Sequence, residues 1–168
     1  MLQKKCNFIP IGYPIGFDVS TGEYVIERIG GDNVQITLEA FLLWSSTFAD
    51  AFELDTSKDV IMLSLIENEI IIPYLSHDDL YHKIKLLNIT RNGIGWQQDG
   101  KICIVNEKEY FLSNSLQYSI WQKANGRLKV ESVFNSKFAD VSKKDNSFKR
   151  RFTSSIIFLV KLGVVRLR

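Results

Sequence analysis

The chain has 168 residues, of which 45% are hydrophobic and 24% are charged, and its formal net charge is +2. This length is enough for one domain of ordinary size or for two small ones. No run approaches the roughly 18 apolar residues that a transmembrane helix needs, and the N-terminus lacks the apolar core of a secretory signal. We therefore expect a globular protein of the bacterial cytoplasm that does not enter a membrane.

The two halves of the chain differ in charge. Residues 1–83 contain 5 Lys or Arg and 13 Asp or Glu, whereas residues 84–168 contain 16 and 6. This contrast favours different partners for the two halves, with nucleic acid as the first candidate for the basic half. The alternative is that the halves attract each other, either within one molecule or between molecules of a homo-oligomer.

A β-hairpin is predicted near the start of the chain. The segment PIGFDVSTGEYVI, residues 14–26, places Gly22 in a turn between two runs of strand character, where glycine supplies the positive φ. The following RIGGDN, residues 28–33, is predicted to be a second turn between strands. It is not a phosphate-binding loop, because it does not join a strand to a helix and no Lys follows it.

Two helices and a strand complete the first half. Thr37 precedes LEAFLLW and is a typical N-cap residue, so a helix containing Trp44 is expected there. A later helix is expected to end at Asn68 within LIENEIII, residues 65–72, because Asn readily takes the left-handed conformation that ends a helix. A strand follows at once.

The segment SHDDLYHKIKLL, residues 76–87, predicts an exposed linker helix over residues 76–88, with Ser76 as the N-cap. His77 and His82 are five residues apart and therefore point about 140° apart around a helix, which is a poor arrangement for sharing a metal ion. Cys6 and Cys103 are too few and too unpatterned for a disulfide framework or a zinc site, and both are expected to be reduced thiols. We expect no metal and no other cofactor.

The second half repeats the order of the first. GIGWQQDGKICI, residues 93–104, again has an Ile-Gly-aromatic triplet, a turn glycine and a short strand, and Ser113 or Asn114 then begins a helix that contains Trp121. After this helix, apolar residues recur at every fourth position over residues 129–140, which predicts a further, amphipathic helix. The expected elements are helices at 114–124, 129–140 and 146–162 and a strand at 163–168.

This repetition predicts an α+β fold built from two pseudo-symmetric copies of one module, at residues 1–75 and 89–168. Residues 7–73 should superpose on residues 86–168, apart from the additional helix near 129–140. The aromatic residues that recur in both copies are predicted to lie in the core rather than on a stacking platform for nucleic acid. They are Phe17, Trp44, Trp96 and Trp121.

The second half resembles a known architecture. LSNSLQYSIWQKANGRLKVESVF followed by FKRRFTSSIIFLVKLGVVRL is similar to a winged helix-turn-helix, and more narrowly to the small peptide-recognising winged-helix domains of the PqqD-like type. The similarity spans about Lys101 to Arg168. It implies a tandem winged-helix protein, and the PqqD-like type implies an extended peptide that adds as a strand beside the last helix.

The last helix carries the predicted binding residues. Phe148, Phe152, Ile156 and Leu159 form an apolar stripe, which is expected to turn the basic residues of the same helix towards solvent. The candidate nucleic-acid contacts are Lys143, Lys144, Lys149, Arg150 and Arg151. In a winged helix the final helix can enter the major groove of duplex DNA.

The sequence therefore predicts a non-enzymatic protein that binds nucleic acid through its basic half and regulates transcription, while the acidic half docks a protein. The alternative is a peptide- or protein-recognition adaptor of the PqqD-like kind. An enzyme is not predicted, because no nucleophile elbow, phosphate loop or equivalent motif frames the individual Ser, His and acidic residues.

Overall fold

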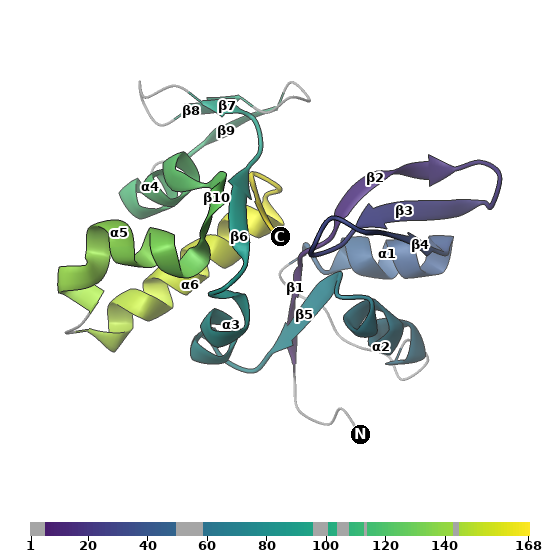
Figure 1. The fold of residues 1–168 in the computed structure, drawn as a ribbon, viewed down its shortest axis with the longest axis horizontal. Coiled ribbons are helices and arrows are strands. Elements are labelled where there is room, and N and C mark those ends of the chain that lie inside the picture. Colours follow the sequence, from purple (N-terminus) through teal and green to yellow (C-terminus); the bar gives the residue numbers. More distant parts are fainter. Residues whose placement is uncertain (1–5, 50–58, 96–100, 104–107, 113, 143–144) are drawn as a thin grey trace. The chain divides into compact units, whose positions relative to one another are not determined.

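The computed structural model describes residues 6–49, 59–95, 101–103, 108–112, 114–142 and 145–168 (Figure 1). The chain divides into two compact units, here called unit 1 (residues 1–76 with Arg168) and unit 2 (residues 77–167). Both contain helices and small antiparallel sheets, so the α+β fold class is confirmed. Within the described ranges, no helix is long and apolar enough to cross a membrane.

The described part of unit 1 contains two small sheets and two helices. Strands β2 (Tyr13–Asp18), β3 (Glu23–Glu27) and β4 (Asn33–Ile36) form one antiparallel sheet, and β1 (Asn7–Pro10) pairs with β5 (Ile71–Tyr74). The helices are α1 (Leu38–Ser46) and α2 (Asp59–Glu67). Both predicted turns are confirmed: Gly22 has a φ of +73°, and Gly30 and Gly31 join β3 to β4 with positive φ.

The core of unit 1 brings these elements together around apolar side chains from both sheets and both helices. Among its buried members are Ile26 of β3, Trp44 of α1, Met62 of α2 and Ile71 of β5. The indole N–H of Trp44 donates a hydrogen bond to the Ile70 carbonyl oxygen at 3.2 Å. Trp44 is therefore a core residue, as predicted.

The described part of unit 2 contains four helices. They are α3 (His77–Ile84), α4 (Ser115–Lys123), α5 (Val130–Ser142) and α6 (Asn146–Lys161), close to the predicted spans. Strand β6 (Asn88–Arg91) lies between β10 (Asn125–Lys129) and β11 (Val165–Leu167). A second sheet joins β7 (Ile94–Gly95), β8 (Lys101–Cys103) and β9 (Glu109–Phe111).

Helix α3 is an integral part of unit 2 and not an exposed linker. Its residues Leu80, Tyr81 and Ile84 are buried, and the helix packs against α6. The Tyr81 ring also lies 5.3 Å from that of Phe134 on α5. The expectation of an exposed helix over residues 76–88 is wrong, because the apolar residues at spacings of three and four form a face that is buried within unit 2.

The strand pairs that close the two units have the same register. In unit 1, Pro10 pairs with Ile71 and Ile9 with Ile72. In unit 2, Arg91 pairs with Val165 and Thr90 with Arg166. Each of these β1 residues therefore matches the β6 residue 81 positions later, and each of these β5 residues matches the β11 residue 94 positions later. The offset is constant along both strands, so the two pairs have the same register.

The helix ends before these strands also match. The amide of Ile70 donates to the Leu65 carbonyl at 3.2 Å, and the amide of Val164 donates to the Leu159 carbonyl at 3.1 Å. The residue before each donor is left-handed, with φ of +71° at Gly163 and +57° at Glu69. Glu69, and not Asn68 as expected, therefore takes the conformation that ends α2.

Helices α1 and α4 have the same length, and a side-chain oxygen caps the N-terminus of each. Thr37 caps α1 by accepting from the Ala40 amide, and Asn114 caps α4 by accepting from the Leu116 and Gln117 amides. Trp44 and Trp121 occupy the seventh position of these nine-residue helices, and both are 2% exposed. The two predicted core tryptophans are confirmed.

The Ile-Gly-aromatic triplets match less well than they do in the sequence. Gly16 pairs with Val25, whereas in unit 2 it is Ile94 that pairs with Cys103, so the glycines are one position out of step with the strands beside them. A Cβ atom on Gly95 would lie 2.1 Å from the Trp121 ring, whereas one on Gly16 would contact nothing.

The remaining two aromatic predictions have different outcomes. Phe17 is 52% exposed and lies at the edge of the Tyr24 ring, so the expectation that it belongs to the core is wrong. It lies on β2, which is an edge strand of its sheet and pairs with β3 alone among the residues described. Trp96 lies outside the described residues.

Candidate nucleic-acid interface

Helix α6 positions the predicted basic residues. Asp145 caps its start by accepting hydrogen bonds from the Ser147 amide and hydroxyl, and these bonds lower the pKa of the Asp145 carboxyl. The predicted apolar stripe of Phe148, Phe152, Ile156 and Leu159 is buried. The three basic residues between Phe148 and Phe152 therefore leave the helix in different directions.

Lys149 is held against α3 and does not face solvent freely. Its ammonium lies 3.3 Å from a carboxylate oxygen of Asp78 and 4.8 Å from the centre of the Tyr81 ring. Its side chain is only 24% exposed. The prediction that Lys149 faces solvent is therefore wrong, because the residue joins α6 to α3.

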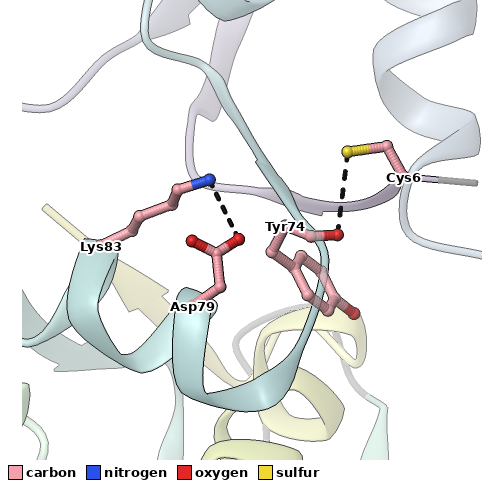
Figure 2. A network of polar contacts seen from close by, with 4 residues as sticks. All are labelled: Cys6, Tyr74, Asp79 and Lys83. Atoms are coloured by element: carbon pink, nitrogen blue, oxygen red, sulfur yellow. Dashed lines mark hydrogen bonds and ion pairs between the residues drawn. The ribbon is translucent and has the colours of Figure 1, made fainter. Parts of the chain in front are cut away.

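The neighbouring acid of α3 has a local partner instead. Figure 2 shows the ammonium of Lys83 beside the carboxylate of Asp79, one turn away on the same helix, at 3.2 Å. Asp78 is thus the acid of α3 that pairs with α6. Lys143 and Lys144, the other two predicted contacts ahead of α6, lie outside the described residues.

Arg150 and Arg151 are the two predicted contacts that face solvent. The Arg151 guanidinium lies 5.6 Å from the centre of the Phe148 ring, and both side chains are exposed. In the described part of the chain, no carboxylate forms an ion pair with either guanidinium. Partial burial and then the Arg150 charge lower the pKa of His77.

These two arginines line a groove of about 640 Å³ between the start of α4 and one side of α6. The sequence did not predict the polar residues that share the groove, namely Asn114, Ser115, Ser119 and Ser154. Ser155 lines it too, but it is buried and its hydroxyl donates to the Arg151 carbonyl. The serines do not stand out in the sequence because they are common on exposed helix surfaces.

The groove has a consistent electrostatic character. Helices α4 and α6 contain five Lys or Arg and no Asp or Glu. The N-terminus of α4, which the helix dipole polarises positively, lies at the same groove. Guanidinium and hydroxyl groups donate hydrogen bonds to phosphate oxygens, so this arrangement suits an anionic ligand.

Helices α1 and α2 of unit 1 have the opposite chemistry. From the matched helix positions, Ser115, Ser119 and Ser154 correspond to Leu38, Leu42 and Val60. These three apolar side chains are exposed by 54%, 58% and 77%. Helices α1 and α2 contain Glu39, Asp59 and Glu67 and no Lys or Arg.

The histidines and cysteines form no chemical centre where they are described. No group of three or more His, Cys, Asp or Glu side chains that could hold a metal occurs within the described ranges. Cys6 is a free thiol that donates a weak hydrogen bond to the Tyr74 carbonyl at 3.8 Å (Figure 2). The side chain of Cys103 lies outside the described part of the structure.

No protein family, curated protein or solved structure that we compared with this chain matches it. The function must therefore be argued from the chain's own geometry.

Proposed function

We propose that this protein is a non-enzymatic, nucleic-acid-binding regulator of transcription, and that unit 2 contacts duplex DNA along the groove between α4 and α6. The observation that carries the proposal is the pair of exposed guanidinium groups, Arg150 and Arg151, in a groove lined by serine hydroxyls. Unit 2 as a whole has 16 Lys or Arg against 8 Asp or Glu. This excess favours binding to a polyanion.

We also propose that the two units are copies of one winged-helix-like module. The shared register of β1–β5 and β6–β11 supports this, as do the shared caps and tryptophan positions of α1 and α4. In this proposal α6 is the helix that approaches the DNA, and its first two turns present Arg150 and Arg151 to phosphate oxygens and base edges.

The test is a salt titration of binding to mixed-sequence double-stranded DNA. The variant R150Q/R151Q should bind more weakly than the wild type, and the slope of log affinity against log salt should fall by about 0.9 for each phosphate that the variant no longer neutralises. Arg127→Gln is the matched control, because Arg127 is an exposed cation of β10 and does not line the groove. The control should keep the wild-type slope.

Two results would overturn the proposal. One is the absence of wild-type binding at about 50 mM salt, where electrostatic binding is strong. The other is an equal slope for the wild type and R150Q/R151Q.

A second candidate function, peptide recognition, has a specific observation in its favour. Strand β11 lies at the edge of its sheet, beside β6, and contacts α6. An extended peptide could add to that edge as a further strand, with its side chains beside the last helix. Binding of this kind depends on main-chain hydrogen bonds and should respond little to salt, which separates it from binding to phosphate.

A further inference from the structure

We infer that unit 1 binds a cationic amphipathic helix of a partner protein on the face of α1 and α2 that carries Leu38, Leu42 and Val60, here called the apolar face. Leu38 and Leu42 are four residues apart on α1 and so lie on one side of the helix. Val60 is in the first turn of α2, which packs against α1. This surface is separate from the arginine groove of unit 2, and the inference does not depend on DNA binding there.

Folding does not require apolar side chains at these three positions. The corresponding positions of unit 2 are Ser115, Ser119 and Ser154. There α4, like α1, has a side-chain N-cap and packs against the later helix of its unit, and α6 ends with the same backbone hydrogen bond as α2. Two buried pairs, Met62 with Ile156 and Leu65 with Leu159, are in contrast apolar in both units. An exposed apolar surface that the module itself does not need indicates a partner.

Contacts between aromatic rings hold the helix that carries Leu38 and Leu42. Phe41 lies between Leu38 and Leu42 in the sequence of α1, and its ring stacks on that of Tyr24 at 4.0 Å. The Phe41 ring also lies 5.6 Å from that of the buried Trp44. These ring contacts hold α1 against β3, so the helix that carries Leu38 and Leu42 is fixed before a partner binds, which reduces the entropy cost of binding.

The negative net charge of unit 1 favours a positively charged partner. The two helices carry Glu39, Asp59 and Glu67 without any Lys or Arg, and unit 1 has 5 Lys or Arg against 11 Asp or Glu. A partner helix with leucine-like residues at i, i+3, i+4 and i+7 and Lys or Arg around them would complement both the apolar and the acidic character. An acidic helix with the same apolar residues would be repelled.

The test uses the full chain and three synthetic peptides. The first peptide is helical, with leucines at i, i+3, i+4 and i+7 and lysines elsewhere; the second replaces lysine by glutamate; the third is a scrambled form of the first. Fluorescence anisotropy should show binding of the first peptide alone. The variant L38S/L42S/V60S, which gives unit 1 the serines of unit 2, should weaken that binding by about tenfold or more.

Two controls distinguish a loss of the apolar face from a general loss of exposed apolar surface and from a loss of folding. V19S/L75S removes two other exposed apolar side chains of unit 1 and should bind the cationic peptide as the wild type does. The serine variant should keep the wild-type circular dichroism spectrum and melting temperature. If it does not fold, Leu42→Ser alone replaces it, with a smaller expected loss.

Three results would overturn the inference. The first is equal binding of the cationic and scrambled peptides, and the second is an equal loss in V19S/L75S. The third is a wild-type dimer in sedimentation experiments that the serine variant dissociates, because the apolar face would then be an interface between copies of this chain.

Discussion

Unit 1 and unit 2 have several local features in common and differ in others. The β1–β5 and β6–β11 pairs have the same register, and helices α1 and α4 share their length, a side-chain N-cap and the position of a tryptophan. In unit 2, 22 residues separate α4 from α6, and β10 and α5 lie there, whereas 12 residues separate α1 from α2 in unit 1. The register of the closing strand pair is nevertheless the same in both units, although β10 and α5 intervene along the chain of unit 2.

The additional strand changes the role of its neighbour. In unit 2, β6 is the central strand, and the Arg91 amide donates to the Ala124 carbonyl at 2.7 Å. In unit 1 the matching residue of β1 is Pro10, which has no amide hydrogen to donate. Within the described residues β1 pairs with β5 alone, so proline stands where an open strand edge would otherwise offer a donor.

The largest expected effect tests whether the two tryptophans are equivalent. Trp44→Ala and Trp121→Ala should each lower the free energy of unfolding by about 3–5 kcal/mol, because each removes a large buried aromatic side chain. Each also leaves a backbone carbonyl, of Ile70 or Asn92, without its indole donor. Chemical denaturation measures both. A small loss in one variant and a large loss in the other would break the comparison.

The next prediction concerns the glycines that the sequence places in the same triplet. Gly95→Ala should destabilise the protein by about 1–3 kcal/mol, because its Cβ would overlap the Trp121 ring. Gly16→Ala should stay within about 0.5 kcal/mol, since its Cβ would contact nothing. Equal thermal shifts for the two variants would contradict the different surroundings of these residues.

A smaller effect should distinguish Lys149, which packs against α3, from Arg150 and Arg151, which line the groove. Lys149→Gln should cost about 1 kcal/mol of stability, because it removes a partly exposed ion pair and a cation–π interaction. It should leave the salt dependence of DNA binding unchanged, in contrast to R150Q/R151Q. Thermal melts and the DNA titration check the two parts, and a changed salt slope would place Lys149 on the DNA.

The smallest effect is a pH dependence that belongs to unit 2, since unit 1 contains no histidine. Burial and the nearby Arg150 lower the pKa of His77, while Asp78 opposes them. The unfolded chain therefore takes up the proton first as the pH falls through about 6.5, and stability decreases below that pH.

Melting temperatures at about pH 7.5 and about pH 5.5 measure this dependence. His77→Gln should reduce the difference between the two temperatures. His82→Gln, a change at an exposed position of the same helix, serves as the control. An equal reduction in both variants would show that His77 is not responsible.

The features that could be predicted from the sequence are those that depend on neighbouring residues. Thr37 and Asn114 cap their helices, Gly22 and Gly163 take positive φ, and the α6 stripe is buried, because each depends on a few neighbouring residues and their spacing. The contrast in charge between the halves could be counted directly. The repeated order of elements was visible for the same reason.

Only the tertiary structure decided which side chains meet across the fold. Lys149 and Asp78 are 71 residues apart, and no local pattern indicates that they pair. The groove beside Arg150 exists because α4 packs on α6. The contrast between its serines and the exposed Leu38, Leu42 and Val60 of unit 1 becomes visible only when the helices of the two units are compared. The physical reason is that burial and pairing depend on the elements brought together by folding, whereas the sequence specifies directly only what lies within a turn or two of each residue.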